Sequence, residues 1–167
     1  MNAFYQSAVN YNGQNLGARR YDRIRKTLGV CLIYASAIGI TLSTLTYAFS
    51  KQLLGIYIVD SQEAIAYGLI RFTYVSLPYF LCGIMEVLTG ILRGLGSSLT
   101  PMLISVLSVC GIRLGWIFTI FQIPQYHTPQ SLYLSYPISW LVTFLAQAVA
   151  LCIIYRKKSG YSILRRN

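Results

Sequence analysis

Long stretches without charged side chains constrain this chain more than any other feature of its sequence. Residues 27–50 carry no charge over 24 positions, and residues 131–155 are also uncharged. A helix of about 20 predominantly apolar residues crosses the ~30 Å hydrocarbon core of a bilayer. Two further apolar runs are interrupted only by isolated residues. The run 65–92 contains Arg71, Pro78 and Glu86, and the run 99–121 contains Arg113. The pattern predicts four membrane-spanning helices.

The composition excludes most classes of soluble protein. Charged residues make up 11% of the chain, against about 25% in soluble domains. That is too little charge to cover a soluble globule, and disordered chains are richer in charge and poorer in aromatic residues. We interpret the net charge of +10 as a signal of membrane orientation, so no nucleic-acid partner is expected.

No residue pattern typical of an enzyme or of a metal site is present. The sequence contains no P-loop, no HExxH and no Cys/His or Ser/His/Asp set. The cysteines are far apart in apolar runs, and we interpret them as small buried hydrophobic residues. We therefore expect no catalytic residue, no metal and no cofactor. The residues concerned are Cys31, Cys82, Cys110, Cys152 and the single histidine, His127.

The predicted fold class is all-α and transmembrane, with four full spanning helices and a partial N-terminal helix. The short polar stretch 3–17 is interpreted as the tail of that fifth helix. We predict one membrane domain over 1–158, followed by a basic cytoplasmic tail over 159–167. The expected helices cover about 2–17, 22–57, 63–94, 99–121 and 131–157.

The basic residues predict the orientation of the chain in a cell membrane. Eleven Lys and Arg residues fall on one side of the predicted spans, and Lys51 alone falls on the other. By the positive-inside rule the side rich in Lys and Arg is cytoplasmic, so the 18–26 loop and the C-terminus are expected there. The eleven residues are Arg19, Arg20, Arg23, Arg25, Lys26, Arg93, Arg156, Lys157, Lys158, Arg165 and Arg166.

Glu86 is the only acidic residue within a predicted span. It lies seven residues before Arg93, which places it about 10 Å inside the bilayer at a rise of 1.5 Å per residue. A carboxylate at that depth is protonated, is paired or faces a water-filled cavity. Two interpretations stay open: a site that binds a proton or a cation, or an ion pair or hydrogen bond that fixes helix packing.

Two other residues within the spans have alternative interpretations. Pro78 removes a backbone hydrogen bond and predicts a kink, which is either a static bend or a hinge. Arg113 either extends its side chain to the membrane surface or pairs with a carboxylate. The glycine pairs Gly13–Gly17, Gly90–Gly94 and Gly111–Gly115 predict close helix packing.

Several polar and aromatic side chains are candidates for the lining of a cavity. Amides cluster along the first helix, where they either bond neighbouring helices or line a polar space. Tyrosines of the following spans either join that lining or fill apolar space. The candidates are Gln6, Asn10, Tyr34, Tyr74, Tyr79 and Cys82.

Two stretches resemble motifs of the multidrug and toxic-compound extrusion (MATE) transporters. GQNLGARRYDRIRK (13–26) resembles the segment in which an apolar helix of the family runs into a basic loop. ILRGLGSSLTPM (91–102) resembles the turn that joins two of its helices on the cytoplasmic side. The residues that carry the resemblance are Gln14, Asn15, Gly17, Ala18, Arg93, Gly94, Gly96 and Pro101.

The resemblance implies that the chain is part of the second of two six-helix lobes, from about the eighth helix of the family to the twelfth. The first lobe and the seventh helix are then missing, and Met1 is an internal methionine. The family exports organic cations and drugs in exchange for Na⁺ or H⁺. Many members carry an acidic residue at the position of Cys82, and Glu86 lies one turn away on the same face, where it could substitute.

The leading hypothesis is a C-terminal fragment of such an antiporter, which is inactive without its missing lobe and has the lipid bilayer and a drug or organic cation as partners. The alternative is a membrane scaffold or assembly subunit that packs helices and does not transport. The two hypotheses differ in whether an aqueous cavity reaches Glu86.

Overall fold

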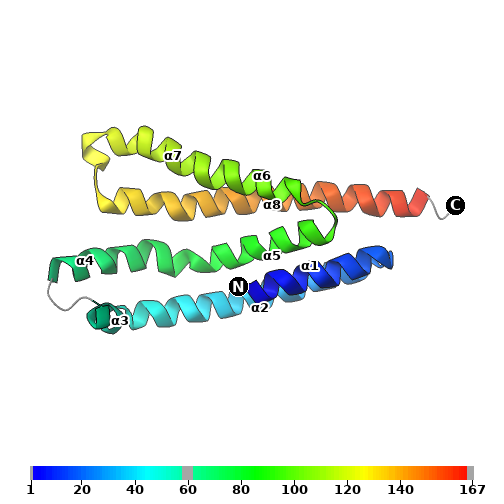
Figure 1. Cartoon of the computed structure of the whole chain (residues 1–167), viewed down its shortest axis with the longest axis horizontal. Helices are drawn as coiled ribbons and strands as arrows, with labels where there is room; N and C mark the ends of the chain where they lie inside the picture. Colours follow the sequence, from blue (N-terminus) through cyan, green and yellow to red (C-terminus); the bar gives the residue numbers. More distant parts are fainter. Residues whose placement is uncertain (1, 58–61, 165–167) are drawn as a thin grey trace.

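The computed structural model describes residues 2–57 and 62–164, and all regular secondary structure in these ranges is helical. Helix α1 spans Asn2–Gly17, and α2 spans Tyr21–Ala48. The chain reverses between them over residues 18–20, where Arg19 has a φ of 56°. The helices then run back and forth along one common direction, as Figure 1 shows.

The first long predicted helix is interrupted near its end. We expected one helix over 22–57, but α2 ends before Phe49, whose backbone leaves α-helical geometry with a ψ of 13°. A separate helix, α3, follows over Ser50–Tyr57. It turns away from the axis of α2 in Figure 1.

The second predicted span is helical throughout, but it changes geometry in its middle. Helix α4 (Gln62–Arg71) is followed by a π-helical turn, Phe72–Ser76, and by a 3₁₀ turn, Leu77–Tyr79. Helix α5 then covers Phe80–Gly94. The irregular segment surrounds Pro78, which lacks the N–H that a regular α-helix would use at this position. The structure therefore departs from α geometry where the sequence predicts a kink.

The last two spans form a hairpin. Helix α6 (Leu99–Ser105), a π-helical turn (Val106–Cys110) and α7 (Gly111–Phe118) make up the first arm. Short 3₁₀ turns lie between α7 and helix α8, which covers Pro129–Leu164 and remains helical through Pro137. Residues 159–164, predicted as part of a separate tail, instead continue α8, and residues 165–167 lie outside the described residues.

Four helical stretches in the described ranges are long and apolar enough to cross a membrane, as predicted. They are Tyr21–Ala48, Glu63–Gly94, Leu99–Gln122 and Pro129–Ser159. Their outer faces expose large apolar side chains; Leu107 is 71% exposed and Phe118 is 72% exposed. Such faces suit contact with lipid or with a further helix rather than with water.

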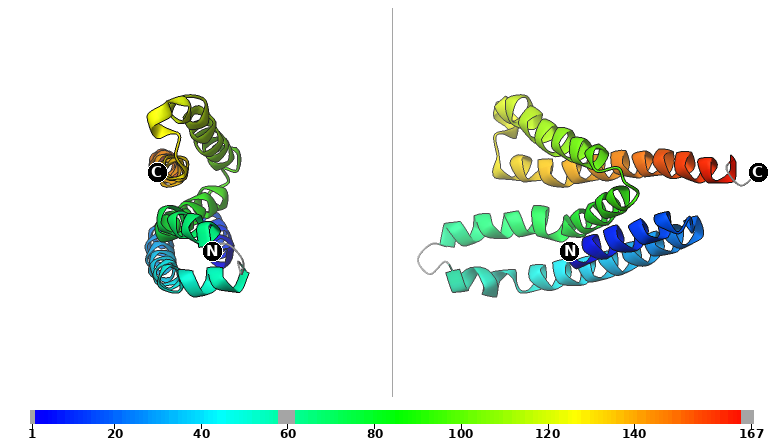
Figure 2. Two further views of the ribbon diagram at one scale, coloured as in Figure 1. Left: turned by 90° about the vertical axis from the view of Figure 1, so that its left-hand side faces the viewer. Right: turned by 45° about the vertical axis from the view of Figure 1, so that its right-hand side comes forward.

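Helix α5 occupies the centre of the bundle and contacts α1, α2 and α8. The views in Figure 2 place α6 and α7 on the opposite side of the molecule from α2. The core lies around the second half of α5, where apolar side chains of α1, α2, α5 and α8 meet. Its most buried members include Ala8, Ile24, Ala35, Val87, Ile91 and Leu92.

All three basic segments of the chain lie at one end of the bundle. The connection between α1 and α2, the turn after α5 and the last part of α8 lie together at the right of Figure 1. Lys51, on α3, lies at the opposite end. We call the end of the bundle that holds the three basic segments the basic end.

Candidate functional site

Glu86 lies in the middle of α5 and is half-buried. Its side chain forms no hydrogen bond and no ion pair with any residue that the structure describes. A carboxylate inside a candidate span that no protein group neutralises is expensive to keep charged. Of the two sequence interpretations, the helix-fixing ion pair or hydrogen bond is therefore absent among residues 2–57 and 62–164.

Tyr79, Cys82 and Glu86 follow one another along one face of the same helical segment. Their spacing of three and four residues places them on neighbouring turns. Cys82 is half-buried, and Tyr79 is 47% exposed. The cavity candidates Tyr79 and Cys82 thus adjoin the candidate coupling residue.

Arg113 reaches from α7 to α8. Its Nε donates a hydrogen bond to Ser139 Oγ at 3.3 Å, and its guanidinium carbon lies 4.0 Å from the ring centroid of Tyr136. Stacking of this kind stabilises a desolvated cation through the ring quadrupole. Within the described chain Arg113 pairs with no carboxylate, so its observed contacts are aromatic and hydroxyl groups of α8.

An aromatic chain connects Arg113 to the turn before α5. The ring of Tyr136 lies 6.2 Å from that of Trp140, and Trp140 lies 5.9 Å from Tyr79, both pairs in edge-to-face geometry. Trp140 is only 6% exposed. The turn before α5 and helices α7 and α8 therefore come together at one base and three aromatic rings, and Glu86 follows on α5 along the face of Tyr79. We call this the charged cluster, made up of Tyr79, Cys82, Glu86, Arg113, Tyr136, Ser139 and Trp140.

A second polar contact lies one turn further along α5. Gln147 of α8 is fully buried, and its Nε2 donates to Thr89 Oγ1 at 3.0 Å and to Ser105 Oγ at 3.1 Å. Its Oε1 is buried without a partner in the described structure. Thr89 is three residues from Glu86, so this contact borders the charged cluster. It also joins α5, α6 and α8 at a single point.

The remaining cavity candidates do not gather around Glu86. Gln6 and Asn10 lie on α1 with exposed side chains, and Tyr74 is half-buried in the π-helical turn. Tyr34 is 59% exposed and lines a different hollow, of about 390 Å³, between α1 and α2. The structure thus links Tyr79 and Cys82 to the acid and separates the other candidates from it.

The motif residues of the turn after α5 have identifiable contacts. Arg93 Nη1 donates a hydrogen bond to the hydroxyl of Tyr5 at 2.6 Å and so joins α5 to α1. Gly96 has a φ of +78°, a conformation that favours glycine. Pro101 is buried in the first turn of α6, where a proline costs no hydrogen bond.

The motif residues at the end of α1 contact mainly their own helix. Asn15 Nδ2 donates to Tyr11 O at 2.8 Å, and the N–H of Ala18 donates to Gln14 O at 3.0 Å. Gly17 has open space where a Cβ would point. These residues therefore shape the end of α1 and do not contact Glu86.

Sequence reasoning missed Gln147, Ser139 and Trp140. A signal for Gln147 was present, because an amide in the otherwise apolar run 131–155 needs a polar partner in a membrane. Ser139 and Trp140 gave no comparable signal, since serine and tryptophan are frequent in such helices. Among the described residues no group of three His, Cys, Asp or Glu side chains could hold a metal ion.

Comparison with known proteins finds a matching family and a similar curated protein. The sequence profile of the MatE family matches residues 3–118, well over half of the chain. The Probable multidrug resistance protein YoeA of Bacillus subtilis (strain 168) is 25% identical over 149 residues, which are 89% of this chain and 32% of that protein. The chain thus spans about a third of the length of the curated relative that it matches. No solved structure matches at a significant level.

Proposed function

Because the chain belongs to the MatE family, we propose that it is part of a secondary active antiporter that exports organic cations or drugs in exchange for Na⁺ or H⁺. The similarity to a protein named for multidrug resistance supports this class of substrate. We place the chain in the cell membrane, with the basic end in the cytoplasm. The coupling site that we propose is the carboxylate of Glu86.

The observation that carries this proposal is the half-buried, unpartnered carboxylate of Glu86 inside a candidate span. A proton or a bound cation lowers the cost of holding that group in the bilayer. The occupancy of Glu86 then favours the protein conformation in which the carboxylate is neutralised. Ion binding and the opening of the cavity to one side are thereby coupled, as alternating access requires.

Arg113 supplies the opposite charge on the facing arm of the cluster. Its contacts with Tyr136 and Ser139 hold the guanidinium without neutralising Glu86. The carboxylate therefore stays available for an exogenous cation. The irregular turns around Pro78 lie just before this face of α5 and supply the hinge that we propose for opening and closing.

The thiol of Cys82 offers a direct test, because it lies one turn from Glu86 on the same face. We would replace Cys31, Cys110 and Cys152 by Ser and measure the rate of maleimide labelling of Cys82 in detergent, with K⁺ replacing Na⁺ at constant ionic strength. A cation at Glu86 should slow labelling, and Glu86→Gln should remove that dependence. For a proton-coupled site, Glu86→Gln should change the pH profile of labelling beyond the titration of the thiol itself.

The matched control is Glu63→Gln, which removes an exposed acid at the start of α4. It should keep the ion dependence of the parent. Ion dependence that survives Glu86→Gln would disprove the coupling role. No ion dependence in the parent, together with a loss of thermal stability in Glu86→Gln, would instead support the scaffold alternative.

We also propose that these 167 residues do not export drugs alone. A transporter of this kind encloses its cavity between two lobes, and the chain spans about a third of the length of the curated relative that it matches. Cells that express only this chain, at membrane levels matched to a full-length family member, should show no drug efflux above empty-vector cells. Efflux above that background would contradict the proposal.

A further inference from the structure

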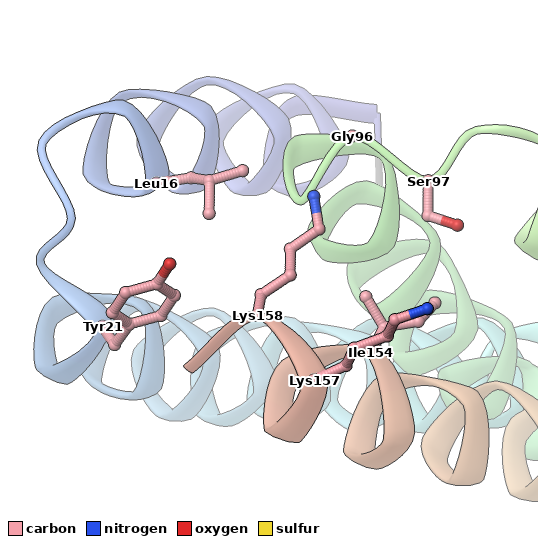
Figure 3. A pocket seen from close by; sticks show the side chains of 7 residues that line it. All are labelled: Leu16, Tyr21, Gly96, Ser97, Ile154, Lys157 and Lys158. Atoms are coloured by element: carbon pink, nitrogen blue, oxygen red, sulfur yellow. The ribbon is translucent and has the colours of Figure 1, made fainter. Parts of the chain in front are cut away.

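A pocket of about 570 Å³ opens at the basic end, and none of its described lining residues belongs to the charged cluster. Four segments contribute to it: the end of α1, the start of α2, the turn after α5 and residues 154–158 of α8. Figure 3 shows it from close by. Its lining residues are Leu16, Tyr21, Gly96, Ser97, Ile154, Lys157 and Lys158.

The pocket carries positive charge, and none of its described lining residues is acidic. The ammonium of Lys158 donates a hydrogen bond to the carbonyl of Leu95, so it is held at the turn after α5. The side chain of Lys157 is exposed and forms no hydrogen bond or ion pair with the described residues. One ammonium is thus fixed and the other is free to reach a ligand.

Gly96 keeps the ammonium of Lys158 accessible. Its φ of +78° suits glycine, and a Cβ at this position would lie 3.4 Å from Lys158 Nζ. Figure 3 shows Lys158 extending across the pocket to Gly96, with the Tyr21 hydroxyl facing the same space. A larger residue at 96 would cover the charge that now faces the pocket.

The other walls of the pocket are apolar. Leu16 and Ile154 line it beside the ring of Tyr21, which is held edge-on against Tyr155 at 6.3 Å. The lining residue Tyr21 begins one candidate span, and Gly96 lies two residues after the end of another, Glu63–Gly94. In a membrane we therefore expect the pocket near the lipid headgroups. A free phosphate needs only the lysines, whereas a phospholipid also has acyl and glycerol groups to place against apolar walls.

We propose that this pocket binds the phosphate headgroup of an anionic phospholipid. The ammonium groups of Lys157 and Lys158 and the hydroxyl of Tyr21 contact the phosphate oxygens, and the apolar part of the lipid lies along Leu16 and Ile154. Basic pockets between helices at the membrane surface have the charge and the position for such ligands. The lipid joins the hairpin of α1 and α2 to α8, independently of the function proposed for Glu86.

The test uses the full chain purified in a neutral detergent and native mass spectrometry. The probes are phosphatidylglycerol, phosphatidylcholine and soluble glycerol 3-phosphate, each titrated alone. We expect one retained phosphatidylglycerol, with weaker retention of phosphatidylcholine and none of glycerol 3-phosphate. Lys157→Gln should weaken phosphatidylglycerol binding about fivefold, the contribution typical of one lysine near an anionic membrane surface.

The matched control is Lys26→Gln, which removes the same charge at the same end but outside this pocket. It should leave phosphatidylglycerol binding unchanged. Lys157 forms no contact that the fold needs, so thermal unfolding of Lys157→Gln should match the parent. Lys158→Gln, which also breaks the contact with Leu95, should weaken binding at least as much.

Three results would overturn the proposal. Equal retention of phosphatidylglycerol and phosphatidylcholine would show that the pocket does not select an anionic headgroup. An equal loss of binding in Lys26→Gln would assign binding to the diffuse charge of the basic end. Retention of glycerol 3-phosphate as strong as that of the lipid would identify a soluble phosphate ester as the ligand.

Discussion

Two glycines on α5 allow α1 to approach its backbone. A Cβ at Gly90 would lie 2.8 Å from Tyr5 O, and one at Gly94 would lie 2.8 Å from Val9 O. Both obstacles are backbone atoms, which cannot rotate away as a side chain can. These two glycines of α5 thus set the distance between α5 and α1, as small residues do in membrane proteins generally.

Gly94→Ala should therefore lower the stability of the chain. Overpacking of a tight contact typically costs about 1–3 kcal/mol, which we expect to appear as a lower midpoint of thermal unfolding in detergent. Gly115→Ala is the matched control, because nothing lies within 4 Å of a Cβ at that position. It should be neutral or slightly stabilising, as alanine is the better helix former. Equal effects of the two substitutions would contradict the packing argument.

The buried side chain of Gln147 fills space between helices, and its amide donates two interhelical hydrogen bonds. Interhelical hydrogen bonds in membrane proteins contribute only about 0.6 kcal/mol on average, and Oε1 of this amide has no partner among the described residues. Gln147→Met should thus cost about 1 kcal/mol, while Gln147→Ala should cost about 2–5 kcal/mol because it leaves a cavity. Thermal unfolding of the two variants separates the effects. A Met variant as unstable as the Ala variant would show that the hydrogen bonds dominate.

Two prolines lie inside long helices and have different local structures. Pro78 lies in a 3₁₀ turn that follows a π-helical turn, whereas the chain stays α-helical through Pro137. The difference indicates that proline alone does not interrupt a helix here. The additional residue in the π-helical turn accompanies the interruption at Pro78, and such turns often occur at functional positions.

Pro78→Ala should straighten the segment that joins α4 to α5. We would attach spin labels at Ala66 and Arg93 in a cysteine-free chain and measure their separation by pulsed electron resonance. A regular helix over these 27 steps places the labels about 40 Å apart at 1.5 Å per residue. The variant should approach that distance with a narrower distribution than the parent. Pro137→Ala, with labels at Leu134 and Arg156, should change little, and equal changes in both helices would contradict a special role for Pro78.

The whole bundle gathers its three basic segments at one end, as Figure 1 shows. The charge distribution predicts that this end is cytoplasmic. A cysteine-free chain with Arg20→Cys or His127→Cys tests this prediction, since both residues are exposed and belong to opposite ends. In intact cells an impermeant maleimide should label position 127 and not position 20. Labelling of position 20 alone would show that the basic end is extracellular, opposite to the prediction.

Four spans and their approximate limits could be predicted from the sequence alone, because crossing a bilayer depends on the local length of apolar helix and on nearby charges. The breaks in helical geometry within those spans could not be predicted from the sequence. Neither the end of α2 at Ala48 nor the π-helical turn at Val106–Cys110 contains a proline that would mark it in the sequence. Among these breaks, only the irregular segment at Pro78 was predicted from the sequence, as a kink.

The charged cluster shows the same division. The sequence by itself marked Glu86, since an acid in an apolar run needs an explanation, and it left open whether that acid is paired. The tertiary structure decided that Glu86 has no partner among the described residues and that Arg113 contacts Tyr136 and Ser139. Which faces of separate helices meet is set by packing between residues distant in sequence. No local pattern in a single chain determines it.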